Sequence, residues 1–556
     1  CDWSSDVCSS DLKLARWVYN RVFSLPGIKD SVCKSQENDF NVYRCKIIRK
    51  IEIQVIGPYT GKLSSNSQKQ TIQQFINKLH LKTRSWVIKN QLLFQVNQEL
   101  EETALRESER LLRLQGYIQD AVIEVVSDNK SNSVDVKVFV ADRWALIAPV
   151  SIQDINHASI SFIHKNMLGA GQRLEQKIGY VARAPFQYKV NYYVNNIDHT
   201  YISGSVFHES DFPNSRVGIA LDRSFYSPLV NWAGGVEQQR QRLAIKNELS
   251  DKDSIFKNVF NGWWIGKNIP LENGKHSLEF MRNWFSGFRF TNTKWSNTEL
   301  REDVTQLLFS TGLSIKRFFK TRFLYRFGAQ EDIPEGIQAQ LYEGKILNEN
   351  TNDRNYYGFD YSAALKFSIG YVAVRYLQGV YFENSRLIKD RKEFNLNFFS
   401  KLLLLKEWKF RFFFNTRVEQ VNGNSIEKAI RINSDDLYGL NGEHTESLKK
   451  IVLNLEMVAY TPFNWLGFKP TGVVVYGAGE TAEVYKHIFG CPIYSAIGAG
   501  FLFRNEQLLN STFQLTMAYY PVQPNGERNV VRFNSLITFS LRINPFFISK
   551  PSFLFY

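Results

Sequence analysis

Apolar side chains recur at every second position over much of this chain, and this alternation constrains the fold more than any other feature. The clearest case is the C-terminal end, where Phe533, Ser535, Ile537, Phe539, Leu541 and Ile543 alternate with Asn534, Leu536, Thr538, Ser540 and Arg542. Successive side chains of a β-strand point to opposite faces, so this stretch would have one nearly apolar face and one mostly polar face.

The same alternation recurs far upstream, at 188–195, 216–222, 408–415 and 513–519. In 408–415 we expect Phe410, Phe412 and Phe414 to face one way, with Lys409 and Arg411 facing the other. Many such strands in an aromatic-rich chain are typical of a transmembrane antiparallel β-barrel, with apolar faces toward lipid and charged faces toward a wet lumen. A large soluble β-sandwich array or β-propeller is the alternative.

A long apolar strand at a sheet edge is an aggregation hazard, and closure of a barrel removes such an edge. We therefore expect 532–556 to form the closing strand. Its apolar and aromatic positions include Phe539, Leu541, Leu554 and the terminal Tyr556.

The composition agrees with a membrane barrel. Aromatic residues make up 14% of the 556 residues and suit interfacial girdles, while no apolar run reaches the length of a membrane-spanning helix. The net charge of +14 would also suit nucleic-acid binding. Because the Lys and Arg residues are dispersed along strands, we expect contact with anionic lipid or a basic lumen instead, and no nucleic-acid partner.

The N-terminal residues contribute little to the fold prediction. Residues 1–12, CDWSSDVCSSDL, read as the translation of a sequencing adapter joined to a truncated reading frame, which would also account for the missing signal peptide. Residues 13–45 show no clear period. The remaining cysteines are Cys33, Cys45 and Cys491. Cys33 and Cys45 could form a disulfide or stay as free thiols. Because the cysteines are few and form no CxxC motif, we expect no zinc site.

Residues 46–142 have the pattern of a small α+β domain. A strand that begins at Lys46 and ends before Gly57-Pro58 is followed by helices at 69–79 and 101–115, and then by strands at 121–126 and 134–140. In the second helix the leucines share one face, Glu101 and Glu102 stand at the positive end, and Gly116 suits the C-terminal cap.

This region resembles a POTRA domain. The resemblance lies in the LLF run Leu92–Phe94, the helical sequence ESERLLR and the Gly116-Tyr117 turn. Downstream, NMLGAGQ resembles an N-x-L-G-x-G turn between early barrel strands, through Asn166, Leu168, Gly169 and Gly171. DRSFYSP at 222–228 and the NLE sequence at 454–456 add to it. Together these segments resemble the BamA/TamA superfamily of outer-membrane surface-antigen proteins, which includes two-partner secretion transporters.

The resemblance implies a periplasmic POTRA domain at 46–142 and an outer-membrane barrel of about 16 strands at 143–556. It implies protein insertion or translocation, with unfolded outer-membrane or secreted proteins as clients and outer-membrane lipid around the barrel. Periplasmic accessory lipoproteins are further partners that the resemblance allows. A passive or structural barrel that has lost assembly activity is one alternative, and a basic-lumen channel for anionic solutes is another.

The family's lid loop carries an Arg that pairs with acids on the next two strands. Here the aligned residues are Leu440, Asn441 and Gly442, so the Arg is absent. One strand acid is kept as Glu456, and the other aligns with Gly477. The alternative is that LYGLNG is an ordinary polar turn. We also expect extracellular loops at 330–355 and 420–449, which are polar and aperiodic.

No catalytic constellation is visible. The histidines are scattered without metal-ligand spacing, and the glycines of LGAGQ are not followed by the Lys-Ser/Thr of a phosphate loop. We therefore expect no catalytic, cofactor-binding or metal-binding residues, and no enzyme activity.

Overall fold

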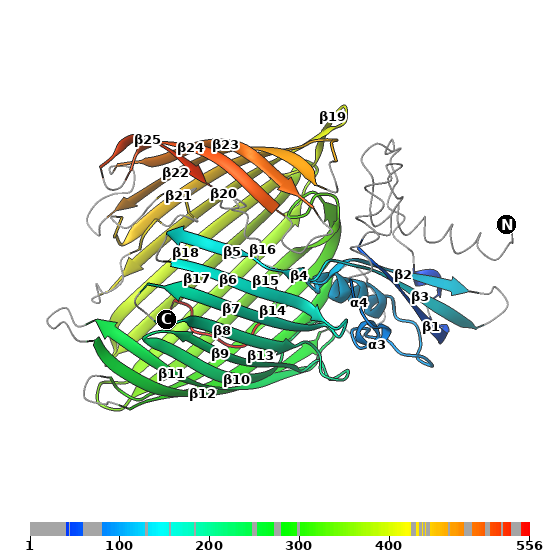
Figure 1. The fold of residues 1–556 in the computed structure, drawn as a ribbon. Coiled ribbons are helices and arrows are strands. Elements are labelled where there is room, and N and C mark those ends of the chain that lie inside the picture. Colours follow the sequence, from blue (N-terminus) through cyan, green and yellow to red (C-terminus); the bar gives the residue numbers. More distant parts are fainter. Residues whose placement is uncertain are drawn as a thin grey trace.

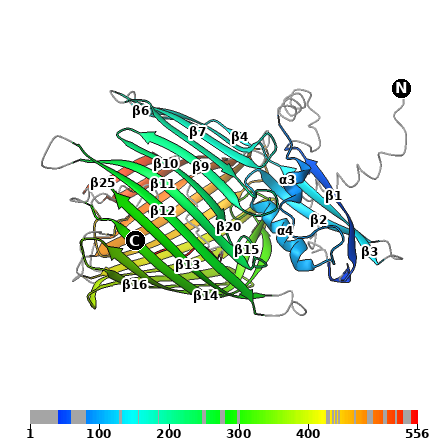
Figure 2. The same cartoon turned by 90° about the horizontal axis from the view of Figure 1, so that it is seen from below.

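The fold is taken from a computed structural model (Figures 1 and 2). It describes residues 40–43, 45–58, 80–127, 132–154, 157–182, 185–246, 253–271, 280–296, 301–423, 430–432, 436–437, 440, 445–464, 468–482, 492–505, 512–523, 526–534, 546 and 548–555. A small N-terminal α/β unit lies at one end of a large curved sheet in both views.

The N-terminal unit packs two helices against a three-stranded sheet. Its elements are η1 Phe40–Tyr43, β1 Ile47–Ile56, α3 Ser85–Lys89, α4 Glu102–Leu114, β2 Ile118–Ser127 and β3 Ser133–Asp142. The strand order is β1-β3-β2, with β1 parallel and β2 antiparallel to β3. Leu105 and Leu112 of α4 pack with Val136 and Val138 of β3 in one buried core.

The three strands and the helix predicted at 101–115 are confirmed, with strand ends within four residues of the predicted bounds. The helix predicted at 69–79 lies outside the described residues. The short helix α3 was not predicted; Val87 and Ile88 are buried in it. Cys45 is a free, exposed thiol, and Cys33 lies outside the described residues.

All other strands belong to one antiparallel sheet. They are β4 Leu146–Ile147, β5 Val150–Asp154, β6 His157–Met167, β7 Gln172–Val181, β8 Gln187–Val194, β9 Ser203–Asp211, β10 Asn214–Arg223, β11 Trp232–Lys246, β12 Asp253–Pro270, β13 Met281–Trp295, β14 Val304–Arg322, β15 Gln330–Asn348, β16 Arg354–Lys366, β17 Gly370–Glu383, β18 Arg386–Ser400, β19 Leu403–Leu405, β20 Trp408–Asn422, β21 Lys449–Tyr460, β22 Lys469–Ala482, β23 Tyr494–Arg504, β24 Thr512–Val522 and β25 Arg528–Asn534. Neighbours along the chain pair with each other, except that β4 and β5 both pair β6, and β20 pairs both β18 and β19.

The two faces of this sheet differ as the alternation predicts. On β14, Phe309, Leu313 and Ile315 are exposed, whereas Leu308 and Lys316 between and beside them are buried on the concave side. On β20, Phe412 is 43% exposed and Arg411 only 3% exposed, which confirms the predicted direction of that strand. We call the convex, apolar face the exterior and the concave face the interior.

The sheet has 22 strands among the described residues, β4–β25, more than the 16 expected. One reason is that 330–348, expected to be an extracellular loop, is the 19-residue strand β15. Glu331, Glu335, Gln338 and Gln340 of this strand are all buried and polar, which obscured the alternation in the sequence. None of the described helices is long and apolar enough to cross a bilayer.

The C-terminal end also differs from the prediction. The last strand among the described residues is β25, Arg528–Asn534, and 548–555 has no strand structure. Leu554 therefore does not belong to a closing strand. Its backbone N–H donates to the Tyr356 hydroxyl and its carbonyl accepts from the Tyr381 hydroxyl, in place of ladder bonds. Phe539, Leu541 and Tyr556 lie outside the described residues.

Candidate functional site

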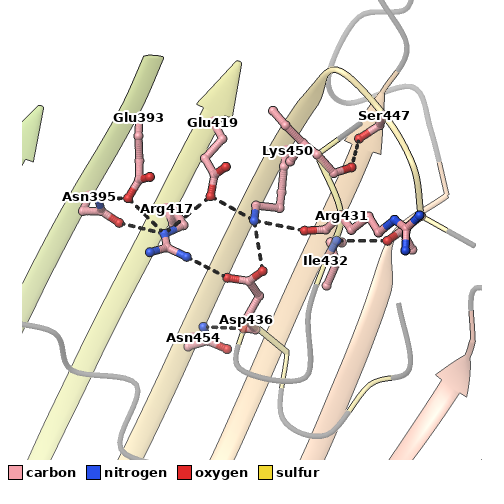
Figure 3. Close-up of polar contacts among 12 residues, drawn as sticks. Glu393, Asn395, Arg417, Glu419, Arg431, Ile432, Asp436, Ser447, Lys450 and Asn454 are labelled. Atoms are coloured by element: carbon pink, nitrogen blue, oxygen red, sulfur yellow. Dashed lines mark hydrogen bonds and ion pairs between the residues drawn. The ribbon is translucent and has the colours of Figure 1, made fainter. Parts of the chain in front are cut away.

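The connection between β20 and β21 folds back onto the interior face of the sheet (Figure 3). Leu437 and Leu440 of this connection are buried, and they pack with Val452 of β21, Ala518 and Tyr520 of β24. We call the described residues of this connection, 430–432, 436–437, 440 and 445–448, the interior loop. Its buried apolar side chains hold it against the interior face of the sheet, whereas a loop in solvent would have no such contacts.

A cluster of five charged side chains joins the interior loop to the strands (Figure 3). Asp436 of the loop lies 3.1 Å from Arg417 of β20 and 3.0 Å from Lys450 of β21. Lys450 also lies 2.9 Å from Glu419, and Arg417 lies 3.3 Å from Glu393. The register places Glu419 directly opposite Lys450, so the strands themselves bring these groups together.

Main-chain atoms of the loop are held as well. The Lys450 ammonium donates to the Arg431 carbonyl at 3.1 Å, and the Asn454 amide donates to the Asp436 carbonyl at 2.9 Å. Ile432 N–H donates to the Thr445 hydroxyl at 2.9 Å. Because Asp436, Lys450 and Glu419 are all buried, each of these charges depends on its partners.

The predicted lid-loop residues are only partly brought together. Leu440 is buried in the loop, while Asn441 and Gly442 lie outside the described residues. Gly477 faces the loop, since a Cβ there would lie 2.9 Å from the Leu437 side chain and 2.8 Å from Asn454. Glycine at this position thus permits close approach of the loop.

Glu456 is placed differently. It lies on the interior face, 5% exposed, opposite Phe413 and Val475 in the two ladders. Among the described residues its Oε1 has no hydrogen-bond partner, and no ion pair joins it to the interior loop.

The polarity of the loop contact is the reverse of the one that the resemblance implies. Here the loop supplies the acid, Asp436, and the strands supply the bases, Arg417 and Lys450. Asp436 was not among the predicted residues, because the resemblance points to an Arg in this loop. The acidic pair Asp435-Asp436, four residues before the aligned motif, was the available signal.

The early-strand turn forms part of a second interior contact, the junction with the N-terminal unit. Leu168, Gly169 and Gly171 all have positive φ, as expected for a turn of this kind. Asn166 is buried; its amide donates to the Thr83 hydroxyl, and its side-chain oxygen accepts from Gly171 N–H. A Cβ at Gly169 would lie 2.3 Å from the Lys82 carbonyl, so glycine is required for this contact.

Charged side chains of α4 complete the junction. Arg113 lies 2.7 Å from Asp332 of β15, and Glu109 lies 2.8 Å from Lys320 of β14. Nearer the start of the helix, Glu107 binds Arg110 at 2.7 Å and accepts from the Ser227 hydroxyl. Both signs of charge are thus present on each side of the junction.

The same side chains cover the outer edge of β2. Ile123 N–H donates to Glu109, the Ala121 carbonyl accepts from Arg113, and the Gln119 carbonyl accepts from Arg326. These three main-chain groups alternate along β2 and point away from β3. The β2 edge of the unit is therefore closed by the junction.

Electrostatics in the unit reflect burial at this junction. Burial raises the pKa of Asp120 to about 6, although Arg113 opposes the rise. Burial also acts to raise the pKa of Glu109, but Lys320 and Arg113 outweigh it and hold that pKa below its usual range.

Comparisons with known proteins give structural likeness without sequence likeness. No family model matches this sequence, and a search of curated proteins found no match. Among solved structures, CdiB from Acinetobacter baumannii is similar at 11% identity and TM-score 0.38, over 88% of this chain and 73% of that one. CdiB from Escherichia coli is similar at 9% identity and TM-score 0.32, over 94% of both chains.

BamA from Haemophilus ducreyi, lacking POTRA domains 1–3, is similar at 10% identity and TM-score 0.31, over 88% of this chain and 84% of that one. The outer-membrane alcaligin receptor FauA from Bordetella pertussis is similar at 11% identity and the same TM-score, over 69% of this chain and 73% of that one. TM-scores this low carry no argument about the fold or the function of this chain. The description of the fold therefore rests on the strand pairing above, and that of the site on its contacts.

Proposed function

We propose that this chain is an outer-membrane β-barrel protein of the BamA/TamA type, which inserts or translocates other proteins. In this proposal the N-terminal unit is a periplasmic POTRA domain. The observation that carries it is the one-sided docking of a small α/β unit, through its α4 face, onto one end of a sheet whose exterior is apolar. An apolar exterior at alternate positions suits lipid.

The unit offers a strand edge to an extended client. Whereas α4 and Arg326 cover the β2 edge, β1 pairs with β3 on one side only. On the other side the described residues bond the start of β1, where Lys46 and Ile48 share main-chain hydrogen bonds with 97–100. Addition of a client strand there would be specified by main-chain hydrogen bonds with little demand on sequence. Clients of this kind are unfolded outer-membrane or secreted proteins.

The sheet closes, in this proposal, where β25 and β4 are neighbours in the strand order. A closed barrel has no free edge, and its unfolding is slow. The purified protein in detergent is therefore expected to change its migration on a denaturing gel after boiling. Identical migration before and after boiling would contradict closure.

The function itself is tested by reconstituting the full chain in liposomes and adding an unfolded outer-membrane β-barrel protein. We expect the client to become heat-modifiable and protease-protected faster than in protein-free liposomes. Conductance of anions without any acceleration of client folding would instead support a passive, basic-lumen pore.

A further inference from the structure

The last residues of the chain lie against the interior wall of the sheet. Pro551 and Leu554 approach Gly287 of β13 and Gly379 of β17, both at interior positions. In Figures 1 and 2 the C-terminus lies within the outline of the sheet in both views. We call residues 546 and 548–555 the terminal segment.

Polar groups of the wall bind the main chain of this segment. Lys316 donates to the Phe546 carbonyl, Arg289 to the Pro551 carbonyl at 3.4 Å, and Lys389 to the Phe555 carbonyl at 3.0 Å. Tyr381 donates to the Leu554 carbonyl, and the Tyr356 hydroxyl accepts from Leu554 N–H. All five contacts go to main-chain atoms, so they would be available to other sequences.

Side chains of the segment enter separate apolar sites. Phe546, 1% exposed, packs in the cluster that contains Phe413 and Tyr460, whereas Ile548 packs with Phe225 and Trp264. Further along, Phe553 contacts Tyr356, with ring centroids 4.8 Å apart. The wall thus selects apolar side chains at spaced positions of an extended chain.

Glycines on three alternate strands make room for the segment. A Cβ at Gly287 would lie 3.0 Å from Pro551, one at Gly344 would lie 3.0 Å from Phe553, and one at Gly379 would lie 2.9 Å from the Leu554 carbonyl. At Gly287 and Gly379 the nearest atom belongs to the terminal segment. The absence of side chains at these glycines therefore leaves space for the main chain of the terminal segment against the sheet.

We propose that this interior groove, across β13–β18, is a binding site for extended polypeptide with spaced aromatic or aliphatic side chains, and that the terminal segment occupies it as an internal competitor. The ligand in trans is an unfolded stretch of a client protein, and in this respect the proposal rests on the proposed function. A client segment enters only as the terminal segment leaves.

The test uses the protein in detergent, complete and truncated after Asn534, with a fluorescent peptide of residues 546–556, FFISKPSFLFY. Fluorescence anisotropy is expected to show binding to the truncated protein and at least about tenfold weaker binding to the complete chain, because the groove is filled. A peptide with Ser at the positions of Phe546, Ile548 and Phe553 should not bind. Equal binding to both proteins, or no binding to the truncated one, would overturn the site.

Variants of the truncated protein locate the groove. Lys389→Met should weaken peptide binding about tenfold through loss of a charge-assisted hydrogen bond. Lys392→Met, on the same strand but on the opposite face, is the matched control and should leave binding unchanged. Equal effects of the two substitutions would exclude the groove as the binding site.

If the truncated protein does not fold, the complete chain still provides a test. Gly379→Val should displace the terminal segment and increase maleimide labelling of a cysteine introduced by Ser552→Cys. Unchanged labelling would overturn the inference. The two proposals can fail separately. Peptide binding without accelerated client folding would support the groove and contradict the proposed function. Accelerated client folding without peptide binding would support the function and contradict the groove.

Discussion

Two clusters of charged side chains hold other parts of the chain to this sheet, and they differ in composition. One lies at the junction with the N-terminal unit, and the other holds the interior loop. At the junction, α4 supplies Glu109 and Arg113 while the sheet supplies Lys320 and Asp332, so each side carries both signs. At the interior loop, the cluster depends on one loop carboxylate, Asp436, set between strand residues.

The difference predicts which contact can be released. Separating the junction would leave unlike charges together on each side, but Glu109 and Arg113, which are both buried, would lose their partners across it. Releasing the loop removes a single carboxylate, and Arg417 and Lys450 keep Glu393 and Glu419 as partners. We therefore regard the junction as a permanent contact and the interior loop as the movable one.

The largest expected effect is at the junction. Arg113→Ala would leave Asp332 and Glu109 buried with fewer partners, and breaking a buried pair in this way costs about 3–5 kcal/mol. The measurement is denaturant unfolding of the full chain. Arg113→Ala with Asp332→Ala should cost less than the two single substitutions together, and simple additivity would contradict the pairing.

A smaller loss of stability is expected for Asp436→Ala, about 1–3 kcal/mol, because the strand residues still satisfy one another. The loop itself should be released. A cysteine introduced by Thr445→Cys, buried in the present structure, should then react with maleimide much faster. Asp436→Asn keeps the shape without the charge and serves as control; if Asp436→Ala leaves labelling unchanged, the charge cluster does not hold the loop.

The junction should also show a pH dependence set by Asp120. Its folded pKa of about 6 lies above the ordinary value of 3.8, so the folded state binds the proton more tightly, and stability falls as pH rises from about 4 to 6. Asp120→Asn should abolish that fall and be more stable than the original chain at pH 7, at about 1.4 kcal/mol per pKa unit. A parallel pH profile in the two proteins would exclude Asp120 as its origin.

The smallest effect concerns Gly477, which faces the interior loop. Gly477→Asp places a second carboxylate beside the loop that carries Asp436, and it should be tolerated better when combined with Asn441→Arg. The coupling is measured as a double-mutant cycle on stability. A value within about 0.5 kcal/mol of zero would show that positions 441 and 477 do not face each other.

The sequence predicted the strands, their faces and the N-terminal unit well because these follow from local alternation and helix periodicity. Phe412 and Arg411 are on the faces that simple alternation assigns. The strand β15 was missed because many of its buried side chains are charged or amide-bearing, and their partners, such as Arg317 for Glu335, come from a neighbouring strand. Such pairing is invisible in the sequence of one strand.

The candidate site was predicted only in outline. Alternation puts Lys450 on the same face as Glu456, but its partner Asp436 depends on the path of a loop, which no period encodes. The contact of the Asn166 turn with Thr83 likewise joins segments 83 residues apart. The resemblance pointed to this loop through an Arg that the sequence lacks, so it gave no indication of Asp436.

The terminal segment also bears on the order in which the molecule assembles. Its wall contacts join residues far apart along the chain: 166 residues separate Lys389 from Phe555, and 262 separate Arg289 from Pro551. Contacts of such long range are slow to form because the intervening chain must be ordered first. Residues 546–555 are synthesised after all the strands that they contact, so they dock late, and until they do, a newly made molecule has its interior groove open.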